Sequence, residues 1–508
     1  MLAKIDSYGL KGLDGYGVEL EIDINSGLPG IEFVGLADTA VKESKERIKS
    51  AIKNSGFRFT PKKITVNLAP ASMKKEGTLY DLGMALGILC ATEQLAVTAL
   101  AGFVVLGELS LDGRVRPIRG LMPLLIAAKD AGHTRFIIPS ENRREASHIG
   151  GVQVFAFDDL RQVVGFLHGE IAVPPLKKAD ICLSASAGQG GDFAYIKGQY
   201  LAKRALEIAA AGGHNVLMIG PPGAGKTMLA RAIPSILPDL STEEALETTK
   251  IHSVAGILNP EEGIIRVRPF RSPHHSVSAT ALTGGGSNAR PGEMSLSHNG
   301  VLFLDELPEY TRATLENLRQ PLEDGVITVS RAARTVEYPA SFMLVASMNP
   351  CPCGYYGAKD RACACSPAMI GRYLSKLSGP LLDRIDLHMN VSNVQYDEIA
   401  GEGLSEPSAD IRGRVNAARA IQGERFAGMG VYCNAKMTGG MIKTYCKPDA
   451  AGERILKNAF EKMRLSARAY TKILKTARTI ADLGGAAHIE EAHIKEALLY
   501  RNLDREYI

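Results

Sequence analysis

A glycine-rich segment at residues 220–227 has the residue types needed to hold phosphate groups. It reads GPPGAGKT, follows the apolar run VLMI and opens a segment of helical character. Glycines let backbone N–H groups turn inward around phosphates, and the following helix presents its positive end to them. Lys226 would contact the β- and γ-phosphates, and Thr227 would coordinate Mg²⁺. This context predicts a nucleotide-binding loop made of Gly220, Pro221, Pro222, Gly223, Ala224, Gly225, Lys226 and Thr227.

Two acidic residues, Asp305 and Glu306, come directly after the apolar run VLFL at residues 301–304. Open α/β folds place their ligands at the ends of such strands. Asp305 would hold the Mg²⁺ shell, and Glu306 would orient and polarise the water that attacks the γ-phosphate. An apolar run before Asp-Glu is common by itself, so its interpretation depends on the loop at 220–227.

An amide ends a third apolar run, FMLVASMN at residues 342–349. Asn349 could hydrogen-bond the γ-phosphate or the attacking water, the role known as sensor 1. Strands and helices alternate throughout this region, and that pattern predicts a parallel α/β core.

Two arginines are candidates for stabilising charge on the transferred phosphate. Arg384 lies in the run GPLLDRIDL, at the start of a further strand, and a fork-shaped guanidinium suits phosphate charge. Arg468 opens a helical segment near the C-terminus, from which it could swing over the nucleotide as sensor 2. Each could equally form a surface salt bridge, as most arginines do. We predict an arginine finger at Arg384 and sensor 2 at Arg468.

Four of the eight cysteines crowd into residues 351–365, as two Cys-x-Cys pairs. Cys351, Cys353, Cys363 and Cys365 offer four thiolates, enough for a tetrahedral Zn²⁺ site. The commoner zinc spacing is C-x₂₋₄-C, so a reduced hairpin that merely packs is the competing interpretation. Histidine and glutamate are absent from this segment, so a metal here would be structural.

The composition is that of a globular protein with more than one domain. The 508 residues are 45% hydrophobic and 22% charged, and this length exceeds a single core. No apolar run reaches the roughly 18 residues of a membrane span, and early acidic residues argue against a secretory signal. We therefore expect a cytoplasmic protein. The net charge of +4 is weak, so nucleic-acid binding would need a local basic channel.

Changes in pattern divide the chain into four segments. Residues 1–172 mix short strand-like and helical runs, and residues 173–194 have the Pro, Ala, Ser and Gly content of a linker. Residues 195–392 alternate strands and helices, and residues 393–508 have helical periodicity. The expected fold class is multidomain α/β, with an N-terminal α+β domain, a parallel-sheet core that carries the phosphate loop, and a C-terminal helical domain.

The ordered motifs resemble the magnesium-chelatase-like AAA+ ATPases of the ComM/YifB family. Nearly the whole chain takes part, through Gly198-Gln199, GPPGAGKT, RPFRSPHH, PGEMSLSHNGVLFLDELPEY, NPCPCG, SGPLLDRIDLH and LSARAYTKILKTARTIADL. The resemblance implies an ATP- and Mg²⁺-dependent hexameric ring, with the arginine finger acting across a subunit boundary and a C-terminal helical lid. It also implies a DNA helicase that migrates branches in homologous recombination during natural transformation.

The same resemblance implies two insertions that point into the channel of the ring, at residues 266–295 and 328–341. Both contain arginines beside glycine-rich stretches or at a hairpin tip, where cations could grip DNA phosphates. The alternative is that these arginines solvate loops or bridge subunits. The paired His274 and His275 show no metal-ligand spacing. The candidate DNA contacts are Arg266, Arg268, Arg271, Arg290, Arg331 and Arg334.

Residues 1–172 resemble the proteolytic domain of Lon, most clearly at GELSLDGRVRPI (107–118) and AAKDAG (127–132). Lon-type peptidases use a serine that a lysine activates. Alignment with that family puts Leu79 and Met122 at those two positions. We therefore predict a degenerate domain without peptidase activity, which assists ring assembly or binds DNA.

Three functions remain open from the residues and the resemblance. The first is a hexameric DNA motor whose partner is single-stranded or branched DNA. The second is the ATPase subunit of a metal chelatase, which the Lon-like domain and the missing integrin-like segment disfavour. The third is an ATP-dependent unfoldase or protease, which Leu79 and Met122 disfavour.

Overall fold

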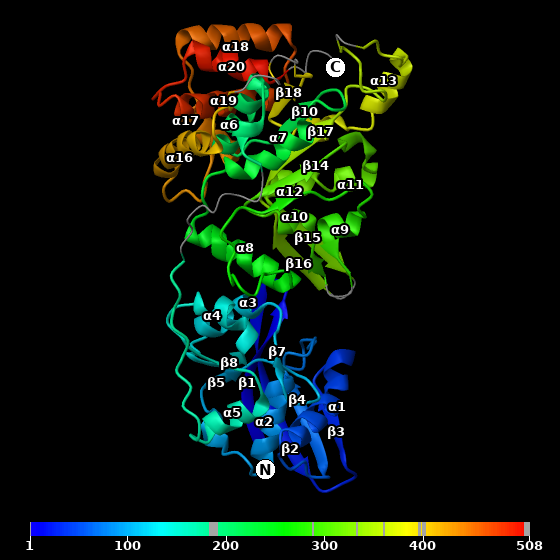
Figure 1. The fold of residues 1–508 in the computed structure, drawn as a ribbon, viewed down its shortest axis with the longest axis vertical. Coiled ribbons are helices and arrows are strands. Elements are labelled where there is room, and N and C mark those ends of the chain that lie inside the picture. The colour runs from blue at the N-terminus through cyan, green and yellow to red at the C-terminus, as the bar shows by residue number, and fades with distance from the viewer. Residues whose placement is uncertain are drawn as a thin grey trace. The chain divides into compact units, whose positions relative to one another are not determined.

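The computed structural model describes residues 2–181, 191–286, 289–331, 334–358, 361–394, 398 and 403–501, without the side chains of residues 331–334. The chain forms two compact units (Figure 1). The first consists of Met1–Cys182 and Thr242–Ile265, and the second of Leu183–Ser241 and Arg266–Ile508. The segment 242–265, which the sequence pattern places in the ATPase core, therefore groups with the N-terminal residues. The finer boundaries stay predictions.

The first unit is built around a seven-stranded mixed sheet in the order β3-β4-β2-β1-β5-β8-β9. β1 pairs with β2 and β2 with β4 in antiparallel fashion, whereas the β1-β5-β8-β9 half is parallel. A short β6-β7 pair lies outside this sheet. The strands are β1 (Leu2–Lys11), β2 (Asp14–Asn25), β3 (Gly30–Val34), β4 (Lys63–Ala69), β5 (Phe103–Val105), β6 (Glu108–Leu109), β7 (Val115–Arg116), β8 (Arg135–Pro139) and β9 (Gln153–Phe157).

One helix of this unit, α2, is buried along its whole length, because its sequence DLGMALGILCA has no polar face. Two glycines one turn apart, Gly83 and Gly87, let it approach the sheet closely. A Cβ added at Gly87 would lie 2.3 Å from Cδ1 of Ile22. The helices are α1 (Thr39–Asn54), α2 (Asp81–Ala91), α3 (Leu121–Asp130), α4 (Arg143–Ser147), α5 (Leu160–Leu167) and, from the later segment, α8 (Thr242–Ala255).

The two positions aligned with the Lon catalytic pair are apolar and packed. Met122 is fully buried, and Leu79 packs partly buried against the same apolar cluster. Neither side chain can act as a nucleophile or a base. The absence of peptidase activity stays a prediction.

The second unit contains a five-stranded parallel sheet in the order β11-β14-β17-β10-β18. This confirms the parallel α/β core expected from the apolar runs. Because all strands run the same way, the chain segments that follow β10, β14 and β17 leave the sheet at one edge. The strands are β10 (Val216–Ile219), β11 (Phe270–Arg271), β14 (Val301–Leu304), β17 (Met343–Met348) and β18 (Leu387–Asn390).

Smaller elements follow β11 and β14. The expected hairpin at 328–341 is formed by antiparallel β15 (Val326–Arg331) and β16 (Arg334–Pro339). The segment 266–295 contains β11, a short helix and the antiparallel pair of β12 (Gly284–Gly285) and β13 (Arg290–Pro291). The helices of this region are α9 (Ala279–Thr283), α10 (Glu293–Leu296), α11 (Arg312–Glu316), α12 (Arg319–Asp324), α13 (Pro367–Leu374) and α14 (Gly379–Leu382).

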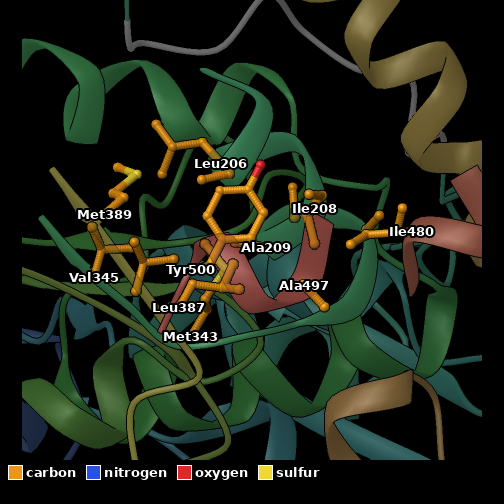
Figure 2. Packing of buried hydrophobic residues seen from close by; sticks show 14 of the residues in the cluster. Leu206, Ile208, Ala209, Met343, Val345, Leu387, Met389, Ile480, Ala497 and Tyr500 are labelled. Atoms are coloured by element: carbon orange, nitrogen blue, oxygen red, sulfur yellow. The ribbon is translucent and has the colours of Figure 1, made fainter. Parts of the chain in front are cut away.

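Helices from both ends of this unit share one apolar core with the sheet. Figure 2 shows the side chains of α6, β17, β18, α19 and α20 gathered near the ring of Tyr500. The helical C-terminal region expected from the sequence is thereby confirmed, and no helix in the described ranges is long and apolar enough to cross a membrane. The helices are α6 (Tyr200–Gly212), α7 (Lys226–Ala232), α16 (Ser408–Arg425), α17 (Gly439–Tyr445), α18 (Ala450–Lys462), α19 (Ala467–Leu483) and α20 (Glu491–Leu499).

Candidate nucleotide-binding site

The glycine-rich loop joins β10, an interior strand of the parallel sheet, to α7. Gly223 and Gly225 have φ angles of +82° and +88°, a region that side chains with a Cβ rarely adopt. Gly220 is needed for a close approach, since a Cβ there would lie 2.0 Å from the carbonyl oxygen of Val391. The loop backbone is therefore shaped as the motif predicts.

Lys226 is the first residue of α7, and its ammonium group points back into the loop. Its Nζ donates to the carbonyl oxygens of Gly220 (2.7 Å) and Pro221 (2.9 Å) and to Oδ1 of Asn349 (3.0 Å). Burial lowers the pKa of Lys226, and the negative charges of Asp305 and Glu306 oppose that shift. The ammonium group of Lys226 thus connects the phosphate loop to Asn349 at the end of β17.

Asp305, at the end of β14, is held by two hydroxyl groups. Thr227 Oγ1 donates to its Oδ2 at 2.9 Å, and the Ser347 hydroxyl donates to its Oδ1. A carboxylate beside a hydroxyl is an oxygen donor set that fits Mg²⁺, which prefers one or two carboxylates together with substrate phosphates. The residues present therefore fit the metal that the motif implies.

Glu306 has an unusual backbone for a non-glycine residue, with φ +52° and ψ +51°. Such conformations persist where neighbours fix them, and they cluster at functional sites. Its N–H donates to Asp305 Oδ1 (3.1 Å) and Ser347 Oγ (3.3 Å). The side chain is 55% exposed, and its Oε2 lies 3.6 Å from Nδ1 of His275. The hydrogen bonds to the Glu306 backbone fix the position of its Cα, and its carboxylate is accessible to solvent.

A cavity of about 360 Å³ gathers these groups at the edge of the sheet. It brings together residues 222–227 of the predicted phosphate loop, both acids and the amide, whereas Gly220 and Pro221 are not among its lining residues. Ser347, Met348 and Met228 complete it. The lining residues are Pro222, Gly223, Ala224, Gly225, Lys226, Thr227, Met228, Asp305, Glu306, Ser347, Met348 and Asn349.

Three polar residues near this cavity were not assigned from the sequence. Ser347 is on β17 and Asn349 follows the last residue of that strand, so their two-residue spacing puts both on the same side and could have revealed Ser347. Gln199, just before α6, donates from Nε2 to the carbonyl oxygen of Ala224 at 3.1 Å. His275 faces Glu306, whereas Nδ1 of His274 lies 2.8 Å from the hydroxyl of Ser276. Both residues stand in motifs of the family resemblance, Gly198-Gln199 and RPFRSPHH, but those motifs do not say what either side chain contacts.

Arg384 and Arg468 come together, but neither lines the phosphate cavity. Arg384 is only 9% exposed, pairs with Glu323 and donates from Nη1 to Pro380 O at 2.5 Å. Arg468 is 60% exposed, with Nη2 at 3.9 Å from Glu323 Oε1 and Nη1 at 3.8 Å from Asp383 Oδ2. Lys472, one turn along α19, forms an ion pair with Asp386 at 2.9 Å. The sensor 2 role of Arg468 stays a prediction.

The candidate DNA contacts differ in what their side chains do. Arg271 forms a two-pronged ion pair with Glu293, at 2.6 and 2.7 Å. Arg268 donates to the carbonyl oxygens of Pro238 and Asn299, each at 2.7 Å. These contacts favour structural roles for both. Arg266 is half-buried, Arg290 is exposed on β13, and Arg331 and Arg334 pair through their backbones, while their side chains and the hairpin tip lie outside the described residues.

A parallel sheet with a phosphate loop after the interior strand β10, two acids after β14 and an amide after β17 defines the class of AAA+ P-loop proteins. Comparison with known sequences agrees. Residues 192–399 match the family described as magnesium chelatase, subunit ChlI, residues 20–142 match subunit ChlI of Mg-chelatase, and residues 405–501 match its C-terminal region.

Full-length relatives place the chain more narrowly. It is 43% identical over 507 residues to YifB of Salmonella typhimurium, covering 99% of this chain and 98% of that protein. It is 43% identical over 509 residues to competence protein ComM of Haemophilus influenzae, with the same coverage. Over 135 residues, 26% of this chain and 23% of the relative, it is 30% identical to Lon protease 2 of Bacillus subtilis. The chain belongs to the YifB/ComM family of magnesium-chelatase-like AAA+ proteins.

Proposed function

We propose that the protein hydrolyses ATP with Mg²⁺ as its cofactor and uses the energy to move DNA strands in the cytoplasm. The hydrolysis rests on one observation: three strand ends meet at the phosphate loop. Lys226 Nζ lies 3.0 Å from Asn349 Oδ1, and Thr227 Oγ1 lies 2.9 Å from Asp305 Oδ2.

Each of these side chains has a task in phosphoryl transfer. Lys226 binds the β- and γ-phosphates in place of the loop carbonyls it contacts, and Thr227 and Asp305 hold the metal ion. Bound Mg²⁺ supplies positive charge to the β- and γ-oxygens. Glu306 orients and polarises the attacking water, and Asn349 hydrogen-bonds that water or the γ-phosphate. The chemistry is positioning and charge, as phosphoryl transfer requires.

The arginine pair supports a shared site between subunits of a homo-hexameric ring. Arg384 and Arg468 both lie beside Glu323, away from the phosphate cavity of their own chain. A guanidinium in that position is available to the nucleotide of a neighbouring subunit. Because Arg384 is paired with Glu323, it must exchange this carboxylate for phosphate when it acts, whereas Arg468 is already exposed.

Replacing Arg384 with Ala should leave ATP binding and ring assembly intact and lower hydrolysis by about 10³-fold, the lower end for arginine fingers. The reason is that the finger stabilises charge only in the transition state. ATP turnover, nucleotide affinity and particle mass by light scattering measure the three quantities.

Mixed rings of Arg384→Ala and Lys226→Ala subunits show whose nucleotide Arg384 serves. A Lys226→Ala subunit keeps its arginine, and an Arg384→Ala subunit keeps its phosphate loop, so one kind of boundary carries a complete site. Hydrolysis in the mixture above that of either variant alone supports action across the boundary. A mixture as inactive as its parts would make Arg384 a residue of its own subunit.

The DNA substrate is proposed on the family and on the basic residues of two insertions. One relative bears the name competence protein, and the family resemblance implies branch migration. Arg290 is exposed on β13, and Arg331 and Arg334 lie at the end of the β15-β16 hairpin. We expect these cations to contact DNA phosphates, which carry no sequence information, and therefore expect recognition of DNA structure over sequence.

Purified protein should hydrolyse ATP faster when single-stranded or branched DNA is added, and it should move a four-strand junction with labelled arms. The stimulation should weaken as salt rises, because phosphate contacts release counterions. A catalytically inactive Glu306→Gln protein is the control for junction melting by binding alone. A ring that neither binds DNA nor moves the junction would refute the motor.

A chelatase subunit is the second candidate, because the matched family descriptions name magnesium chelatase. Its mark would be ATP hydrolysis that depends on a partner chelatase subunit and a porphyrin instead of DNA. A genome without such partner subunits would exclude it.

A further inference from the structure

Four cysteine sulfurs converge at the end of the loop that follows β17. The Sγ atoms of Cys351 and Cys353 are 3.4 Å apart, and each lies 3.6 Å from Sγ of Cys363. With Cys365, all four sulfurs lie within 4.8 Å of one another. Disulfide sulfurs would be about 2.05 Å apart. A tetrahedral Zn²⁺ with Zn–S bonds of about 2.3 Å places sulfurs about 3.8 Å apart, close to the spacing found.

The surroundings of these sulfurs suit thiolate ligands. The backbone N–H of Tyr356 donates to Cys351 Sγ at 3.3 Å, and that of Cys365 donates to Cys363 Sγ at 3.4 Å. Such N–H donors orient the ligands of a metal and stabilise their charge. Four soft sulfurs with no oxygen or nitrogen ligand make a closed site, which selects Zn²⁺ for structure and leaves no position for catalysis.

The cysteine segment, residues 349–366, is a long loop that a bound metal would stabilise. Between the end of β17 at Met348 and the start of α13 at Pro367, the described residues form neither helix nor strand. A loop of this length without regular structure is uncommon in a compact domain. A metal that joins both ends of the loop removes much of its conformational freedom.

The first cysteine pair also rests on the phosphate loop. Gly354 has φ +86°, and a Cβ added there would lie 2.5 Å from Cδ of Pro222. Cys351 is fully buried two residues after Asn349, and Pro352 lines a cavity shared with Asn349 and Glu306. The cysteine segment therefore approaches the phosphate loop at Gly354 and lines a cavity together with Asn349 and Glu306.

We propose that Cys351, Cys353, Cys363 and Cys365 bind one structural Zn²⁺ and that the metal-bound segment braces the phosphate loop through the contact of Gly354 with Pro222. The metal site stands independently of the proposed ATPase activity, whereas the brace rests on it. Loss of the metal would loosen the segment and remove its contact with Pro222. Nucleotide binding would then weaken although the catalytic residues themselves are unchanged.

Metal content tests the site. Full-length protein purified without chelator should carry about one zinc per chain by mass spectrometry, and cobalt substituted for it should show the absorption of tetrahedral thiolate coordination. The double change Cys353→Ser and Cys363→Ser should abolish both signals, whereas Cys90→Ala, which removes a buried thiol of the first unit, should leave them. Wild-type protein with no zinc, or with iron alone, would overturn the site, and this outcome does not depend on how the variants fold.

A pair of glycine substitutions tests the brace. Gly354→Ala should keep its zinc and bind ATP about tenfold more weakly, since overpacking against Pro222 displaces the loop. Gly357→Ala is the matched control, because Gly357 also has positive φ (+75°) but nothing within 4 Å of an added Cβ, and it should bind ATP normally. Equal affinity of both variants would overturn the brace. Wild-type protein that binds no nucleotide would instead refute the proposed function and leave the zinc result standing.

Discussion

Glu306→Gln should bind ATP as tightly as the wild type and lose at least about 100-fold in turnover, within the range for a positioned base. The substitution keeps the size of the side chain and removes the charge that polarises the attacking water. The backbone of Glu306 is held through its N–H by Asp305 and Ser347, so the amide should occupy the place of the carboxylate. Nucleotide affinity by fluorescence titration and hydrolysis in a single turnover separate binding from chemistry.

The matched control is Glu309→Gln, the same change three residues along the chain. Glu309 lines the cavity next to Glu306 and lies 3.4 Å from Lys376 through Oε1. Among the described residues it forms no ion pair or hydrogen bond with the phosphate loop, so its loss should leave turnover near the wild-type rate. Undiminished hydrolysis in Glu306→Gln would show that Glu306 does not act in the reaction. Equal losses of turnover in both variants would show that removing either negative charge has the same general effect.

The sequence predicts the centre of the site well, because one physical rule connects its parts. Lys226, Asp305 and Asn349 are far apart in the chain, but each follows an apolar run. If those runs are parallel strands of one sheet, their carboxyl ends share an edge. The order β14-β17-β10 then makes the three strand ends immediate neighbours. Local motifs and one topological rule were sufficient here.

The partners of the arginines could not be predicted in this way. Arg271 and Glu293 are 22 residues apart and Arg384 and Glu323 are 61 apart, and nothing in the local sequence announces either pairing. Charged residues in a predicted loop carry the same pattern whether they meet DNA, solvent or a carboxylate of their own chain. The grouping of α8 with the first unit is also invisible to the sequence, since its helical pattern does not say which surface it packs against.

The cysteines lie between these extremes. Their identity and crowding indicate a metal site, but the Cys-x-Cys spacing is equally compatible with a packed hairpin. Only the fold shows that the two pairs face each other and that Gly354 touches Pro222. Spacing along the chain limits which ligands can meet, and the path of the loop decides whether they do.

Lys226→Ala should abolish nucleotide binding, with a loss of affinity of at least about 100-fold, because truncating one partner of a buried charge-assisted pair costs about 2–5 kcal/mol. Lys226 is 8% exposed and already lies among the loop carbonyls and Asn349. No other described lysine lines the cavity, so none can replace it. Thermal unfolding with and without a non-hydrolysable ATP analogue measures the effect. Ligand at 100 times its Kd stabilises a folded protein by about 2.7 kcal/mol, and this gain should disappear in the variant.

The thermal experiment also excludes unfolding as the cause of the loss. Burial lowers the pKa of Lys226. At pH values below the usual lysine pKa, the buried charge therefore reduces the stability of the folded state, and Ala removes this penalty. Without nucleotide the variant should therefore unfold at a temperature no lower than the wild type. Lys475→Ala is the contrasting control. Lys475, on α19, donates from Nζ to the carbonyl oxygen of Ala435 at 2.7 Å, so its loss should leave the nucleotide-dependent shift in place. A Lys226→Ala protein that still gains stability from the analogue would show that the phosphate loop binds nucleotide without its lysine.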